Sequence, residues 1–140
     1  MDIKRGFAKP SIRNYRIAIG ISLSIIIPLG FASKFYRGPG SWWVIDHAGG
    51  LFYEIFWILL IVLIWLQVSP LRAAVGVFIA TAFLEFLQLW HPPILEAIRA
   101  TSLGRTLIGT TFDWWDFLHY ILGCAVAWRF LRFIRRSGMV

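Results

Sequence analysis

Charged side chains are scarce in this sequence: Asp, Glu, Lys and Arg together make up only 15% of its 140 residues. A typical soluble domain carries about 25% charged residues, and a disordered chain combines low hydrophobicity with high net charge. The scarcity therefore excludes a disordered protein and most water-soluble enzymes. Because 59% of the residues are hydrophobic, the composition is typical of a small protein with several membrane-spanning segments.

Cysteine is almost absent as well. The single cysteine, Cys124, excludes an internal disulfide and hence a disulfide-stabilised secreted domain. It lies in an apolar run without a cation on its own helical turn, so we interpret it as a small packing residue rather than a reactive thiolate. The sequence also lacks a glycine-rich phosphate loop, a nucleophile elbow and any cofactor fingerprint, so we expect no cofactor.

Four apolar runs are long enough to cross or nearly cross a bilayer core of about 30 Å. They cover residues 17–33, 47–68, 71–90 and 115–131. Because the runs are continuous and rich in Leu, Ile and Phe, without the short alternation of a membrane β-barrel, helices are favoured. The fold class that we predict is all-α: a single integral membrane domain, residues 1–140, built as a four-helix bundle.

The segment 91–114 connects the third run to the fourth, and it is too long for a structureless loop in a compact domain. Within it, Ile94, Leu95 and Ile98 form an apolar face at helical spacing, opposite a charged face. We therefore expect residues 93–102 to form a short amphipathic helix at the membrane surface. A flexible, glycine-containing return to the fourth run would follow.

The cations indicate how the helices cross the membrane. Ten of the fourteen Lys and Arg residues lie before the first run, between the second and third runs, or at the C-terminal end, and the other two connections hold four. The positive-inside rule then places both termini in the cytoplasm. The ten residues are Lys4, Arg5, Lys9, Arg13, Arg16, Arg72, Arg129, Arg132, Arg135 and Arg136.

The net charge of +7 also bears on the partners. A basic soluble protein would suggest nucleic acid, but here the cations flank apolar runs and form no groove-like pattern. We therefore expect membrane lipids with anionic headgroups, and no nucleic acid, as partners. A larger membrane complex, in which the chain would be a non-catalytic accessory subunit, stays open as an alternative.

Several ionisable residues lie inside the apolar runs, where they are costly and usually face a bundle interior or water. At a helical rise of about 1.5 Å per residue, Glu54, Glu85 and His119 lie roughly 6–12 Å below the outer ends of three different helices. This common layer predicts an outward-facing polar cavity, covered by the segment 91–114. The ligand-binding residues predicted there are Glu54, Glu85, Gln88, Arg99, Arg105, Asp113, Asp116 and His119.

The polar layer has several interpretations. Its side chains could serve the bundle alone through interhelical hydrogen bonds, or bind an envelope lipid or similar amphiphile, with Arg99 and Arg105 meeting an anionic headgroup. Acid–base catalysis by a Glu/His pair and a metal site that includes His47 are further alternatives, although no H-E-x-x-H or comparable spacing occurs. We favour lipid binding, predict no metal site and favour a protein without enzymatic activity.

The central motifs follow in the order Glu85-Phe86-Leu87-Gln88-Leu89-Trp90, Pro92-Pro93, Ile98-Arg99-Ala100-Thr101, Gly104, Gly109, Phe112-Asp113-Trp114 and Asp116. Over residues 33–128 this pattern resembles a bacterial family of short four-helix membrane proteins of unknown function. That family is similar to the wider VanZ-like group, whose name-giving member is linked to resistance to the glycopeptide teicoplanin. The resemblance implies a four-helix inner-membrane protein and carries over no activity.

Overall fold

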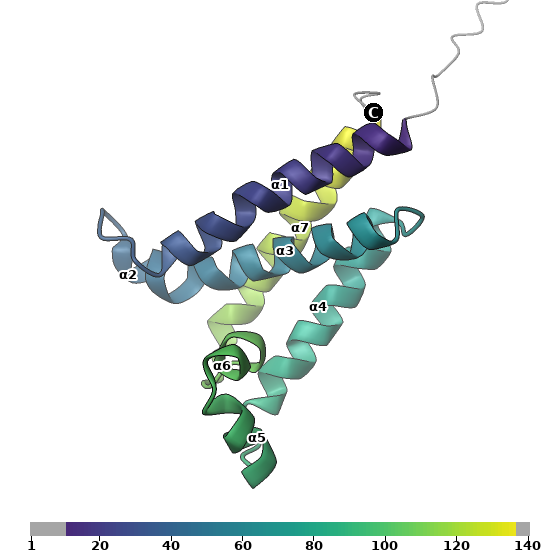
Figure 1. The fold of residues 1–140 in the computed structure, drawn as a ribbon. Coiled ribbons are helices and arrows are strands. Elements are labelled where there is room, and N and C mark those ends of the chain that lie inside the picture. Colours follow the sequence, from purple (N-terminus) through teal and green to yellow (C-terminus); the bar gives the residue numbers. More distant parts are fainter. Residues whose placement is uncertain (1–10, 137–140) are drawn as a thin grey trace, which may run out of the picture.

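The computed structural model of the protein describes residues 11–136, and within that range the chain is helical with no β-strand. The short elements are α2 (Ser41–Trp43), the π-helix η1 (Val44–Ala48), α5 (Pro93–Arg99) and α6 (Ser102–Ile108). Four long helices form the body of the fold (Figure 1): α1 (Ile12–Ser33), α3 (Gly49–Ile64), α4 (Pro70–Leu87) and α7 (Trp114–Arg136). The prediction of an all-α bundle is thereby confirmed.

Four helical stretches are long and apolar enough to cross a membrane, and the second joins α2, η1 and α3 without a break. The second stretch ends at Ile64, earlier than the predicted residue 68. The side chain of Ser69 accepts a hydrogen bond from the backbone N–H of Arg72 and caps α4, and Pro70 follows at the first helical position. This cap sets the start of α4. The stretches are 12–33, 41–64, 70–87 and 114–136.

Helix α7 is the element around which the others assemble. It packs against α3 and α4 and also touches α1, while α1 packs against α3 (Figure 1). Helices α3 and α4 meet at the turn between them and diverge towards their other ends, where α5 and α6 lie beyond the end of α4. The largest fully buried apolar side chains are Ile19, Ile58, Leu59, Val62 and Leu131, from α1, α3 and α7.

Large apolar side chains also cover the outer faces of the long helices. Ile21 on α1, Phe83 on α4 and Val126 on α7 are each at least half exposed. Exposed apolar surface of this extent is unusual for a soluble monomer, whereas the acyl chains of a bilayer match it in polarity. The outer faces therefore agree with the length and hydropathy of the helices in indicating a membrane protein.

The connection between α4 and α7 differs from the prediction in its second half. The predicted surface helix at 93–102 is present as α5, which ends at Arg99, and the expected flexible return is a second helix, α6. The side chain of Thr101 accepts a hydrogen bond from the backbone N–H of Gly104 and so caps the start of α6. This cap is the local reason why the return is helical.

The predicted orientation rests in part on Lys4, Arg5 and Lys9, which lie outside the described residues. The remaining cations of that set lie at the start of α1, at the start of α4 and at the end of α7, which is one end of the bundle. The cytoplasmic placement of the termini stays a prediction.

Gly123 allows α7 to approach α3 closely. A Cβ atom at this position would lie 2.7 Å from the carbonyl oxygen of Leu51 and 2.8 Å from the Cβ of Glu54. Small residues permit such backbone contacts between membrane helices. The α3–α7 contact therefore depends on the missing side chain.

We expect Gly123→Ala to lower the free energy of unfolding by about 1–3 kcal/mol, because the added methyl group overpacks the contact. Thermal unfolding of the purified protein in mild detergent, followed by circular dichroism, measures the effect. Gly76→Ala on α4 is the matched control, since a Cβ there meets nothing within 4 Å. Equal melting temperatures for the two variants would contradict the close contact.

Candidate functional site

Glu85 on α4 is fully buried and its carboxylate accepts three hydrogen bonds. Its Oε1 accepts from the backbone N–H of Asp113 at 2.9 Å. Its Oε2 accepts from the Tyr120 hydroxyl at 2.9 Å and from the Gln88 side-chain amide at 3.0 Å. The same amide also donates to the carbonyl of Ile108, at 3.1 Å. The Glu85 network therefore joins α4 to α6 and to the start of α7.

Glu54 on α3 is also fully buried, and it belongs to a second set of contacts. The Cys124 thiol on α7 lies 3.0 Å from Glu54 Oε2 and 3.5 Å from the carbonyl oxygen of Ala74 on α4. Cys124 is buried, which agrees with a small packing residue. These contacts connect α3, α4 and α7 at a position further along α7 than the Glu85 network.

Arg99 lies at the end of α5 and is only 4% exposed. Its guanidinium donates to the carbonyls of Leu87 and Trp90, at 2.8 and 2.9 Å, and to the carboxylate of Glu96, at 2.6 Å. Leu87 is the last residue of α4, so Arg99 satisfies carbonyls that the helix end leaves free. The structure therefore gives Arg99 a capping contact within the protein, not the outward headgroup contact that we expected.

The exposed partner of Arg99, Glu96, is itself held by a second side chain. Nδ1 of His91 lies 2.9 Å from Oε1 of Glu96. The His91 ring, and after it Arg99, hold the pKa of the Glu96 carboxyl below its usual range. Glu96 is thus an anion that braces α5 against the end of α4.

His47, Asp116 and His119 form a third cluster, between η1 and the start of α7. The imidazole rings of His47 and His119 are stacked, with centroids 4.6 Å apart and an interplanar angle of 3°. Nδ1 of His47 lies 3.6 Å from Oδ1 of Asp116. His119 is buried, with Nε2 3.0 Å from the indole N–H nitrogen of Trp43 and Nδ1 2.7 Å from the carbonyl oxygen of Trp115. We call this group the histidine cluster.

The eight predicted ligand-binding residues thus enter separate sets of contacts. Three belong to the Glu85 network, two to the histidine cluster, and Arg105 lies exposed on α6. The Glu/His pair considered for catalysis is not formed by His119, whose nitrogens face Trp43 and Trp115. His47 was not among the eight, although the alternative of a metal site included it, and it lies beside Asp116 on α7.

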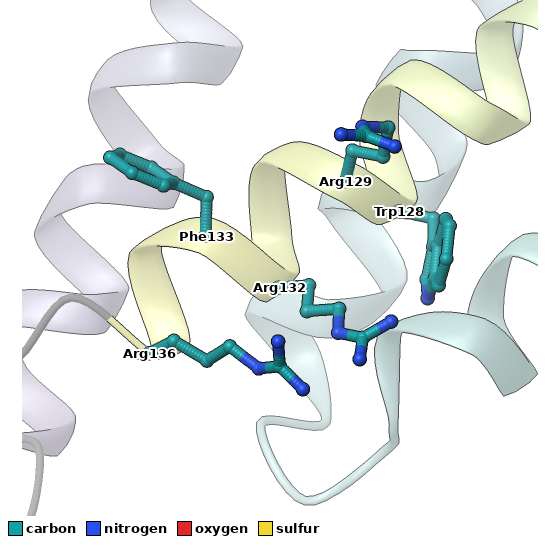
Figure 2. A pocket seen from close by; sticks show the side chains of 5 residues that line it. All are labelled: Trp128, Arg129, Arg132, Phe133 and Arg136. Atoms are coloured by element: carbon teal, nitrogen blue, oxygen red, sulfur yellow. The ribbon is translucent and has the colours of Figure 1, made fainter.

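A groove of about 470 Å³ opens beside the last turns of α7 (Figure 2). Figure 2 shows the guanidinium groups of Arg132 and Arg136 extending in the same direction, with Arg132 between Arg136 and Trp128, and Arg132 lies 5.3 Å from the centre of the Trp128 ring. In the sequence these arginines indicated orientation alone, although their spacing of three and four residues predicts a common face. The lining residues are Trp128, Arg129, Arg132, Phe133 and Arg136.

We expect Glu85→Ala to lower the free energy of unfolding by about 3 kcal/mol or more, because it leaves three buried donors without an acceptor. Glu85→Gln keeps the size and one acceptor oxygen and should lose less. Denaturant unfolding in detergent measures both effects. Asp46→Ala, which removes an exposed acid, is the control. Unchanged stability of Glu85→Ala would show that the network is dispensable for folding.

Arg99→Ala should loosen α5 from the end of α4, because the carbonyls of Leu87 and Trp90 lose their donor. A loss of about 1–3 kcal/mol in local stability corresponds to cleavage roughly tenfold faster, or more, in limited proteolysis of the segment 88–113. Arg99→Lys should be intermediate, since an ammonium group lacks the planar fork that reaches two carbonyls. Arg105→Ala should cleave like the wild type, and equal rates for all variants would contradict the capping contact.

Comparison with known proteins gives a family without an assigned activity. No curated protein and no solved structure matches the chain. The VanZ-like group is not among the families matched, so that wider resemblance stays a prediction. The family model that matches covers residues 40–124, which include the histidine cluster and the Glu85 network but not the arginine-lined groove. Since this match covers more than half of the chain, the protein belongs to the family described as protein of unknown function DUF2809.

Proposed function

We propose that this membrane protein binds the anionic headgroup of a phospholipid in the groove at the end of α7. The observation that carries the proposal is the lining itself: three arginines and two aromatic side chains, with no acidic residue among them. Guanidinium groups donate two parallel hydrogen bonds to a phosphate, and such charged bonds are about twice as strong as neutral ones. A lipid phosphate is the anion that a membrane supplies at this place.

The position of the groove on the helix supports the same ligand. Arg129, Arg132 and Arg136 occupy the last turns of α7, a candidate membrane span, where headgroups would surround them. Phe133, also in the lining, is 59% exposed and offers an apolar surface to the first methylene groups of an acyl chain. In the predicted orientation this end faces the cytoplasmic leaflet, whose anionic lipids attract each cation by about 1 kcal/mol.

The proposed site differs from the outward-facing one that the sequence suggested. Glu54 and Glu85 have no exposed surface and accept hydrogen bonds from protein groups, and Arg99 donates to helix carbonyls. The ligand class, a membrane lipid, is the same, and the site moves to the opposite end of α7. Because the groove lies C-terminal to residues 40–124, the proposal concerns this chain rather than its family. The accessory-subunit hypothesis stays a prediction.

The same arginines also satisfy the positive-inside rule, which requires positive charge but no particular geometry. Lysine separates the two roles, because it keeps the charge and lacks the planar guanidinium fork. A lysine variant should therefore insert in the same orientation and lose the specific phosphate contacts.

We expect the triple variant Arg129→Lys, Arg132→Lys and Arg136→Lys to bind phosphatidylglycerol about tenfold more weakly than the wild type, a loss of about 1.4 kcal/mol. Native mass spectrometry of the detergent-purified protein, titrated separately with phosphatidylglycerol and phosphatidylcholine, measures the affinities. Arg105→Lys, at the other end of the bundle, is the control and should bind like the wild type.

Two outcomes would overturn the proposal. One is a wild-type protein that retains phosphatidylcholine as well as phosphatidylglycerol, since the arginines would then confer no preference for an anion. The other is a triple variant with wild-type affinity for phosphatidylglycerol, since charge without geometry would then suffice. Thermal unfolding of the variants checks that each is folded.

A further inference from the structure

A cluster of metal-ligating side chains lies at the end of the bundle opposite the arginine-lined groove. His47 from η1, and Asp116 and His119 from α7, each offer one ligand atom, and these three atoms lie within 4.8 Å of one another. We propose that the three side chains bind a divalent first-row transition-metal ion, with Zn²⁺ as the reference ion. The proposal is independent of the lipid site, both in its residues and in its ligand.

One pair of the ligand atoms has the spacing that such an ion requires, and all three lie within 4.8 Å of one another. Bonds from Zn²⁺ to nitrogen or oxygen are about 2.0–2.2 Å long, so two ligands of a tetrahedral site lie roughly 3.3–3.6 Å apart. Nδ1 of His47 and Oδ1 of Asp116 are 3.6 Å apart. Two imidazoles and one carboxylate leave a fourth position for water, which is the ligand count of catalytic rather than structural zinc sites.

His119 is held in a tautomer that can bind a metal. Its Nδ1 faces the carbonyl oxygen of Trp115, and its Nε2 faces the indole N–H of Trp43. Since a carbonyl only accepts and an indole only donates, Nδ1 carries the proton and Nε2 presents its lone pair. Metal-bound histidines usually donate their other N–H to a carbonyl or carboxylate in the same way, which fixes the ring.

Trp43 occupies the position that the ion would take on His119. The indole donates to the lone pair that the metal needs, at 3.0 Å, so an ion must displace it. Trp43 is the third residue of the helical stretch 41–64 and is only partly buried, so its side chain can turn away without opening the core. Metal uptake should therefore change the surroundings of this indole.

His47 is the side chain that must turn. Because its ring is parallel to that of His119, the two lone pairs lie in parallel planes and cannot both point at one ion as they stand. Its Nδ1 is buried and has no hydrogen-bond partner among the described residues, so a small rotation breaks no bond there. His47 lies in a π-helical turn, a distortion that is frequent at functional sites.

The exposure of the three side chains also leaves a route by which an ion can enter. The side chains of His47 and Asp116 keep 18% and 24% of their surface exposed, while His119 is buried behind them. An ion can thus reach the partly exposed side chain of Asp116 before it reaches the buried Nδ1 of His47 and the buried His119. The carboxylate of Asp116 supplies the negative charge that offsets part of the charge of the cation.

The test uses the full chain, purified in detergent without a polyhistidine tag and stripped of metal with a chelator. Zn²⁺ is titrated against a competing chromophoric chelator, and the absorption of bound Co²⁺ reports the coordination geometry. We expect one ion per chain, and affinities about 100-fold lower for His47→Ala and for Asp116→Asn. His91→Ala is the matched control, because this histidine lies outside the cluster and contacts Glu96, and it should bind like the wild type.

Trp43→Phe separates a metal site from a purely structural cluster. Removing the competing indole donor should leave the affinity for Zn²⁺ unchanged or raise it, although the protein loses a hydrogen bond. Three results would overturn the proposal: a folded wild type that takes up no Zn²⁺ at micromolar free ion, a His91→Ala variant that loses as much affinity as His47→Ala, or loss of binding in Trp43→Phe. Thermal unfolding verifies that each variant is folded, and Asp116→Asn, which keeps the size of a partly exposed side chain, is the substitution that disturbs packing least.

Discussion

The buried carboxylate of Glu85 is the interaction on which the rest of the structure depends. It has no exposed surface, and it accepts hydrogen bonds from the backbone of Asp113, from Gln88 and from Tyr120. An acidic group without partners at this depth would cost several kcal/mol, so its donors must stay in place once the bundle forms. One carboxylate thereby fixes the start of α7 against the end of α4, and the position of every later residue of α7 follows.

From that fixed start, α7 carries both candidate sites. Asp113 is held by Glu85 through its N–H and accepts a hydrogen bond from the N–H of Trp115, so it also begins the helix. Asp116 and His119 follow within the first two turns, opposite η1. The arginine-lined groove lies at the other end of the helix, whose 23 residues extend over about 35 Å. An apolar middle with Gly123 packed against α3 separates the two, so the candidate sites lie at opposite ends of the helix.

The spans and the polar layer could be predicted because each follows from a pattern along one helix. Contacts between elements could not. The residue pattern of α5 separates an apolar face from Arg99, but it does not show which of the two faces contacts the rest of the protein. In the structure the apolar face is directed outward, and Arg99 is directed inward to the carbonyls at the end of α4. Thr101 did offer a readable signal for α6, as a helix cap. For His47 no residue pattern announces the π-helical turn, so its contact with Asp116 required the structure.

A buried polar side chain can take a ligand only if its present partner can leave. Glu85 fails this condition, because its donors include a backbone N–H and a tyrosine on a packed helix, and removing them would undo the fold. His119 meets it, because Trp43 lies at the start of the helical stretch 41–64 and its side chain is only partly buried. In the absence of an ion the indole satisfies a lone pair that would otherwise be buried without a partner, and the exchange of one partner for another lowers affinity without unfolding anything. The side chains that hold the bundle together thus differ from those that can bind a ligand in whether their present partner can be displaced, rather than in the number of acidic residues.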